Sequence, residues 1–215
     1  VVLGRDLILN RNFTVLPGAV FNGASYKMTL QGPGALWSTP GADYRMTSGH
    51  YLRWSSPSLF VAAGSTVNAL IELTGKATLQ GDLNLIENSR LYPHTGSVLD
   101  ARSSTLTLRG TSDIVSASSG TLYLHDADSW IVYEGTGADR GLNLSTGPYG
   151  GLRFNPSGSG YLTLKTITLD GSLWLQRGVA LSSFTPVITV NGHLLDTGGR
   201  VDLTSPTVST LRMGG

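Results

Sequence analysis

The feature of this sequence that most limits its fold is an apolar–x–apolar triplet that returns along the whole chain. Side chains alternate between the two faces of a β-strand, so each triplet places two apolar residues on one face and one residue on the other. The stretch GYLTLKTITLDGSLWLQRG, residues 160–178, contains three such triplets. Between Leu83 and Leu162 the strongest triplets return after 23, 16, 20 and 20 residues.

This return interval favours a solenoid over a stack of hairpins. Antiparallel sandwiches place turns about every 8–12 residues, whereas one coil of a β-solenoid carries several short strands before the same face returns. The sequence therefore predicts an all-β, right-handed parallel β-helix, or β-solenoid, with coils of about 20 residues. Leu122, Leu142 and Leu162 are expected in one inward column. The pairs Asn22-Gly23, Asp170-Gly171 and Asn191-Gly192 suit coil corners, although such pairs also favour hairpins.

Composition agrees with many short strands and excludes several kinds of protein. Charged residues make up 13% of the 215 residues, about half the usual ~25%, and 28 residues are glycine. The formal net charge of +1 gives no field that would attract nucleic acid, and no apolar run approaches the roughly 20 residues of a spanning helix. The chain has no cysteine, which excludes disulfides and thiolate metal sites.

The expected organisation is a single β-solenoid module over residues 1–215, with an irregular aromatic insertion at about 31–66. That segment is rich in Gly, Ser and Pro and departs from the triplet rhythm. The chain lacks an initial Met and a signal-peptide pattern, so we expect a processed chain or a segment of a longer protein or fibre. Neither end carries an obvious polar cap, which predicts association end to end or with neighbouring repeats of a longer chain.

Residues 120–203 carry the clearest likeness to known proteins. The phrases LTLKTITLDGSLWLQRG and ITVNGHLLDTGG resemble the Gly-punctuated β-strand repeats of bacterial cell-surface proteins, such as autotransporter passengers and filamentous adhesins. The resemblance implies an extracellular, cell-surface role that is structural or adhesive. It carries no catalytic signature, so no site residue can be transferred from it.

The segment between residues 35 and 54 is the candidate recognition surface. It holds Trp37, Tyr44, Tyr51 and Trp54 beside Asp43, Arg45, His50 and Arg53. Exposed aromatic rings can stack on sugars while polar neighbours bind hydroxyls, so the ligand expected at this surface is a glycan. The alternative is that these rings form a small core of their own, because aromatic residues are usually buried.

The densest polar cluster is LHDADSWIVYEG, residues 124–135. Its carboxylates, Asp126 and Asp128 above all, are the candidates for a metal ion or for acid–base chemistry. The competing interpretation is a coil corner in which these aspartates cap their own turn. No nucleophile motif or histidine pair with ligand spacing occurs, and we expect no cofactor.

The sequence leaves two classes of function open. The first is a non-enzymatic structural or adhesive module, part of a surface filament, that could bind glycan. The second is a carbohydrate-active β-helix, either a polysaccharide lyase or hydrolase or a protein like a phage tailspike. An ice-binding solenoid is disfavoured, because Thr occupies only four of the eleven outward triplet centres.

Overall fold

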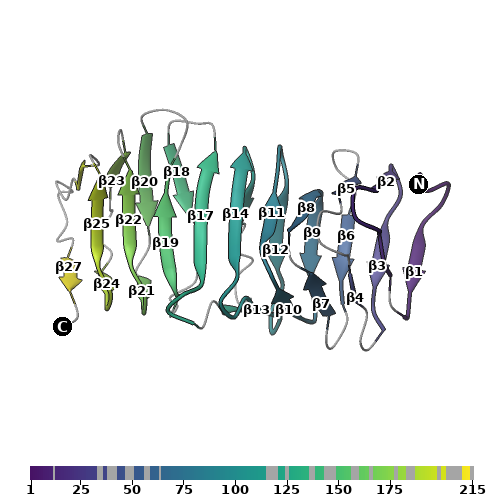
Figure 1. Ribbon diagram of the computed structural model, residues 1–215, viewed down its shortest axis with the longest axis horizontal. Coiled ribbons are helices and arrows are strands. Elements are labelled where there is room, and N and C mark those ends of the chain that lie inside the picture. The colour runs from purple at the N-terminus through teal and green to yellow at the C-terminus, as the bar shows by residue number, and fades with distance from the viewer. Residues whose placement is uncertain are drawn as a thin grey trace.

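The protein is a stack of parallel β-strands wound into successive coils, as the ribbon of the computed structural model shows (Figure 1). All strand pairs between the named strands are parallel. The N-terminus lies at one end of the long axis and the C-terminus at the other (Figure 1). The structure describes residues 1–11, 13–32, 36–37, 43–46, 51–55, 59–62, 64–114, 121–123, 126–135, 139–142, 149–155, 160–164, 167–176, 179–182, 187–197, 200–201 and 210–213.

Face A of the solenoid is one continuous sheet of nine strands, which we call sheet A. Its strands, in spatial order, are β2 (Val20–Ala24), β5 (Asp43–Met46), β8 (Ser65–Asn68), β11 (Leu83–Leu85), β14 (Thr105–Gly110), β17 (Trp130–Gly135), β19 (Gly151–Phe154), β22 (Leu173–Gln176) and β25 (Leu194–Thr197). Because each strand pairs with the one a full coil later, sheet A runs along the rod without interruption.

Face B follows face A in each coil and is formed by two sheets. The first contains β1 (Leu7–Leu9), β3 (Met28–Leu30), β6 (Tyr51–Trp54), β9 (Leu70–Leu73), β12 (Arg90–Pro93) and β15 (Asp113–Ile114). The second contains β18 (Asp139–Leu142), β20 (Gly160–Leu164), β23 (Val179–Ser182) and β26 (Arg200–Val201).

Face C closes each coil and is likewise divided between two sheets. The first contains β4 (Leu36–Trp37), β7 (Leu59–Ala62), β10 (Lys76–Gln80), β13 (Val98–Asp100) and β16 (Thr121–Tyr123). The second contains β21 (Ile167–Leu169), β24 (Val187–Val190) and β27 (Thr210–Met213).

The coils repeat about every 21 residues, which confirms the predicted all-β solenoid with parallel strands. Paired residues are as close in sequence as Ser65 and Leu83 and as distant as Leu106 and Ile131. The variation falls between strands, where a corner can lengthen without changing the pairing. A coil is therefore defined by its three strands rather than by a fixed number of residues.

The core consists of inward columns of apolar side chains, one residue from each coil. On sheet A, Leu85, Leu108, Tyr133, Phe154 and Leu175 stand in register and are buried. The Tyr133 and Phe154 rings stack with their centroids 4.8 Å apart. Each coil contributes only a thin apolar layer, so its burial depends on the coils above and below it.

The expected column of Leu122, Leu142 and Leu162 is wrong. Leu122 pairs with Leu99 on face C, and Leu142 pairs with Leu164 rather than with Leu162 on face B. The spacing of 20 residues between these leucines misled the prediction, because triplets from different faces of a three-sided coil can fall at similar intervals.

Residues 31–66, where the sequence predicts an irregular insertion, contain described strands that belong to the coils. Their strands β4, β5, β6 and β7 all pair in register with strands of neighbouring coils. The pairs Val20–Asp43 and Met28–Leu52 show that the coils here are only slightly longer than the mean.

Buried serines close the turns at the coil corners. The Ser89 hydroxyl lies 2.7 Å from the carbonyl oxygen of Ile86 and 2.8 Å from that of Val67, and accepts a hydrogen bond from the Ala69 N–H at 3.1 Å. Ser89 therefore links the first residue of its own turn to the coil before it. Serines at positions 97, 112 and 129 donate in the same way to the carbonyl three residues earlier.

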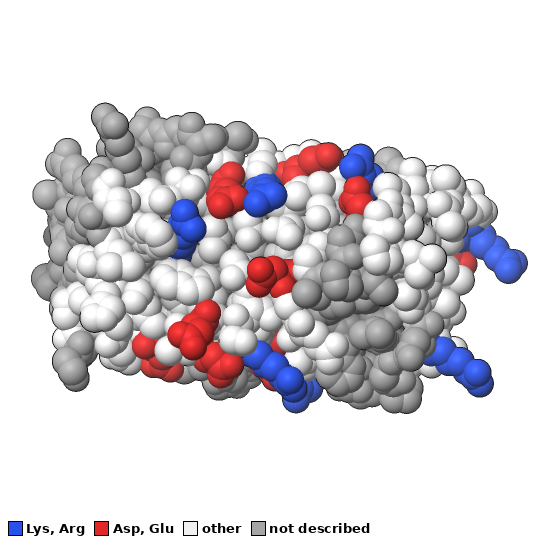
Figure 2. Space-filling view, in the orientation of Figure 1, with Lys and Arg blue, Asp and Glu red and all other residues white. Residues whose placement is uncertain are grey.

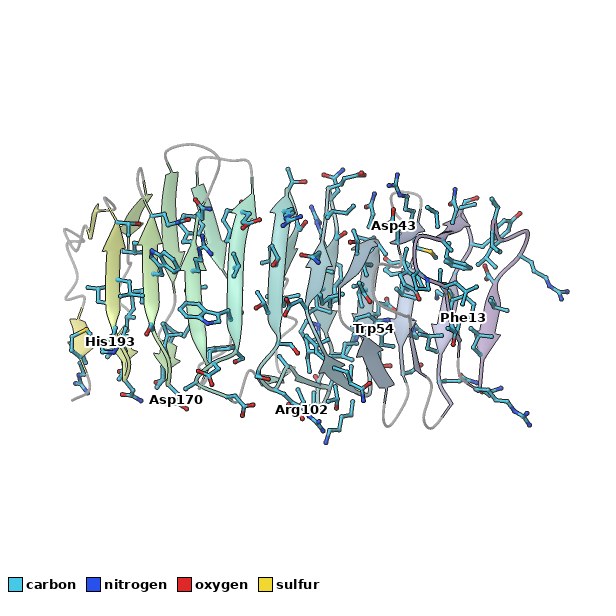
Figure 3. All side chains as sticks on the ribbon, viewed as in Figure 1. Phe13, Asp43, Trp54, Arg102, Asp170 and His193 are labelled. Carbon is cyan, nitrogen blue, oxygen red and sulfur yellow. The ribbon has the colours of Figure 1, made fainter. Side chains whose placement is uncertain are left out.

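The corner between faces C and A also stacks glycines. Gly171 donates its N–H to the Gly150 carbonyl at 3.1 Å, and Gly192 donates to Gly171 at 3.0 Å. A Cβ on Gly192 would stand 2.6 Å from the Gly171 backbone, so the coils approach too closely here for a side chain. Beside this column, Asn191 donates to the Asp170 carboxylate at 3.1 Å. Asp170 and His193 lie toward the lower edge in Figure 3.

Candidate functional site

Two of the four predicted glycan-binding aromatics belong to the core. Tyr44 is 1% exposed and Trp54 is fully buried. The alternation of β5 and β6 turns Tyr44 and Met46, and likewise Leu52 and Trp54, toward the interior. Neither Tyr44 nor Trp54 can therefore stack on an external sugar, and the interpretation of the segment as buried aromatic core is correct for these two rings.

Rings near the N-terminal end, of which Phe13 is partly buried and Phe21 and Tyr44 are buried, form one aromatic cluster. The Phe13 and Phe21 centroids are 5.2 Å apart in an edge-to-face arrangement, and Tyr44 lies 6.1 Å from Phe21. Phe13 and Trp54 lie among the strands of this end of the rod in Figure 3. Two of the aromatics that suggested a surface site, Tyr44 and Trp54, thus fill the first coils.

The other two predicted residues have different surroundings. Tyr51 is 37% exposed, and the Lys27 ammonium lies 5.6 Å from the centroid of its ring. Trp37 belongs to β4, but its side chain lies outside the described residues. Glycan binding by Tyr51 and Trp37 stays a prediction, without the support of the two buried rings.

Asp126 and Asp128 lie in a coil corner, exposed to solvent. The Ser129 N–H donates to the Asp126 carbonyl at 2.8 Å, and the Ser129 hydroxyl donates to the same oxygen. The turn is thus closed by serine rather than by an aspartate side chain. Glu134, from the same sequence cluster, lies on β17 and pairs with Arg109 at 3.0 Å. In the described part of the chain, no group of three His, Asp or Glu side chains could hold a metal ion.

The outer surface of sheet A carries a set of residues that sequence analysis did not single out. We call it the tryptophan–arginine strip: Trp130, Arg153, Trp174, Gln176 and Leu195. Its members come from four consecutive strands, β17, β19, β22 and β25. They point outward because their neighbours Ile131, Leu152, Leu173 and Leu175 point into the core.

The strip is held together by stacking. The Arg153 guanidinium lies over the Trp174 ring, 4.3 Å from its centroid. Trp174 donates its indole N–H to the Thr197 hydroxyl of the next coil at 3.3 Å. The Trp130 ring covers Gly151, where its nearest atom is 2.6 Å from the position a Cβ would take. These contacts place Arg153 and Trp174 in one row along the rod axis, with Trp130 two residues to one side.

Arg153 differs from the other arginines of sheet A in the partners of its charged side chain. Arg45 pairs with Asp43 at 2.8 Å, and that carboxylate raises the pKa of Arg45 above its ordinary value. Arg109 pairs with Glu134. Among the described residues, Arg153 has neither a carboxylate partner nor an acceptor for its buried Nε. On the face that Figure 2 shows, acidic and basic side chains are otherwise interspersed.

Part of this strip was accessible to sequence reasoning. Trp174 is the centre of the triplet Leu173–Trp174–Leu175, so alternation alone predicts that it points outward. Trp130 directly precedes the inward-facing Ile131, so alternation predicts that it points outward as well. What the sequence could not supply was the register that places Arg153 beside Trp174 and Gly151 beneath Trp130.

The fold defines this chain as a parallel β-solenoid repeat protein. No family model, curated protein or solved structure matches the chain, so the likeness to bacterial surface repeats stays a resemblance in sequence style. Within the described residues there is no helix with the length and apolar character needed to cross a membrane.

Proposed function

We propose that this chain is an extracellular structural or adhesive module that forms part of a cell-surface rod or filament. The single observation that carries the proposal is the unbroken nine-stranded sheet A, which links coil to coil along the molecule. A solenoid of this kind separates its two ends by a fixed distance, because each coil adds one strand spacing. Eight spacings of about 4.8 Å give sheet A a length of ~38 Å.

Polar contacts between successive coils support a role in which the rod keeps its shape. Arg53 of β6 pairs with Glu72 of β9 at 2.6 Å, and Arg109 of β14 pairs with Glu134 of β17 at 3.0 Å. Such pairs contribute modestly one by one, about 0–1 kcal/mol at exposed positions. Their effect here is to fix the register of neighbouring coils on the outside, while the apolar columns fix it on the inside.

The proposal includes a partner for the N-terminal end. Apolar side chains are exposed there, including Leu16 at 68% and Val20 at 46%. They border a cavity of about 380 Å³ lined by Val1, Phe13, Thr14, Val15, Leu16, Ala19, Val20 and Phe21. Exposed apolar surface of this kind supports packing against another coil, from a neighbouring repeat or from a second copy of the chain.

The location can be tested by protease treatment of intact source cells, followed by mass spectrometry of the released peptides. We expect peptides of this chain without lysis, while a cytosolic marker stays intact. Release only after lysis would refute an extracellular role. Small-angle X-ray scattering on the isolated chain tests the rod, and a compact, spherical particle would contradict it.

Contact between copies can be tested by sedimentation of the isolated chain over a wide concentration range. If a second copy covers the N-terminal end, Leu16→Glu should reduce association, because it places a charge in the apolar contact. Ser103→Glu, at an exposed turn position, is the matched control. A wild-type chain that stays monomeric at every concentration would exclude the second copy.

A further inference from the structure

The tryptophan–arginine strip links neighbouring coils through its own contacts, and it also leaves aromatic, cationic and apolar groups partly exposed on one outer face. Val132 shows how closely its side chains cover the sheet: it points outward, beside Arg153 in register, but is only 7% exposed. Leu195 continues the strip at 39% exposure. Two tryptophans and a leucine on the outer face of a chain this rich in polar turns indicate a surface that binds another molecule.

The geometry of the strip suits a long, narrow ligand. Trp130 and Trp174 are separated by two strand spacings across the sheet and by two residues along it, which places their Cα atoms ~12 Å apart. Arg153 lies between them, on the intervening strand β19. Arg153 and Trp174 are in register along the rod axis, and Trp130 flanks this row, displaced by two residues along its strand. A linear polymer that lies along the axis on Arg153 and Trp174 could therefore also contact Trp130 at its edge.

The polar atoms define the chemistry of that ligand. Within the part of the chain that the structure describes, the Arg153 Nε has no acceptor and the guanidinium has no carboxylate partner. An anionic group is the complement that a guanidinium binds most strongly, with two parallel hydrogen bonds. Gln176, next along the same outward row of β22, has a buried Oε1 without a donor. A ligand hydroxyl could supply that donor if the Gln176 side chain turned outward.

We infer that the tryptophan–arginine strip binds an acidic polysaccharide. Sugar rings offer C–H faces to tryptophan, hydroxyls to Gln176 and, where they carry a carboxylate or sulfate, an anion to Arg153. A protein partner is disfavoured because the strip has five residues, against the roughly 20–30 that a protein partner usually contacts, and because the ion pair of Arg109 and Glu134 lies on the same face. The inference deepens the proposed function and rests on it, since it requires this face to lie outside the cell.

Binding can be measured by titration calorimetry of the 215-residue chain with polygalacturonate, dextran sulfate and dextran. Polygalacturonate and dextran sulfate distinguish a carboxylate from a sulfate as the anion, and binding of either supports the inference. Arg153→Gln should weaken binding by about tenfold or more, because it removes a charge-assisted hydrogen bond. Trp174→Leu should weaken it similarly, while keeping an apolar side chain over the sheet.

Arg109→Gln is the matched control, because it removes the same charge from the same sheet two strands away. It should bind like the wild type, and circular dichroism should show the same folded signal for all variants. Binding to neither acidic polymer would overturn the inference, as would equal binding to dextran or equal weakening by Arg109→Gln. A change in sedimentation with Arg153→Gln would instead assign the strip to contact between copies. Scattering from the isolated chain does not depend on polysaccharide binding. The rod proposal and the binding proposal can therefore be refuted independently.

Discussion

Leu85→Ala tests whether the stack depends on every coil. Leu85 is fully buried between Val67 and Leu108, the residues in register with it on β8 and β14. Removing three carbons leaves a cavity that cannot collapse unless two neighbouring coils shift, so the expected cost is about 3–5 kcal/mol of unfolding free energy. At about 2–4 °C per kcal/mol for a domain of this size, the melting temperature should fall by ~6–20 °C.

The measurement is urea denaturation followed by far-ultraviolet circular dichroism, with a thermal melt beside it. Asn84→Ala is the matched control, since Asn84 is the outward centre of the same triplet and is partly exposed. Its effect should stay within about 0.5 kcal/mol. Equal losses for the two variants would refute the facing of β11, and a negligible loss for Leu85→Ala would refute the claim that a coil depends on its neighbours.

Three further predictions concern the corners and the surface. Gly171→Ala should cost several times more than Gly4→Ala in the same melts, because its Cβ would lie 2.5 Å from the Ala127 carbonyl oxygen whereas Gly4 is open. Ser89→Ala should cost about 1–3 kcal/mol by leaving buried backbone groups unpaired, against little change for the exposed Ser103→Ala. Arg109→Gln should change stability by at most ~1 kcal/mol in urea, and a larger loss would show that the ion pairs are structural determinants.

Alternation within strands predicted the kind of fold well. The triplets at Leu83, Leu106 and Leu173 are strands of sheet A, with both leucines inward in each, and the coil length was close to the expected 20 residues. Register could not be predicted, because corner length varies and triplets from three faces are interleaved. The column assigned to Leu122, Leu142 and Leu162 failed for that reason.

For two rings of the candidate site, Tyr44 and Trp54, the predicted exposure was wrong for a different reason. The count of aromatics between residues 35 and 54 ignored the side of the strand on which each residue falls. Tyr44 alternates with Asp43 and Arg45 and therefore faces inward. The same rule, applied to Trp174, gives the outward position that the structure shows. The contact between Arg153 and Trp174 joins residues of different coils, and only the folded register brings them together.

The stacking of strands across the long axis determines how the molecule would respond to tension between its two ends. Hydrogen bonds between coils lie along the axis, so a pulling force loads the outermost coil first and opens its bonds in sequence rather than all at once. Each coil that detaches would release ~70 Å of extended chain, from about 21 residues, in place of its ~4.8 Å of rod. The solenoid would lengthen in steps at moderate force, while the remaining coils stay folded.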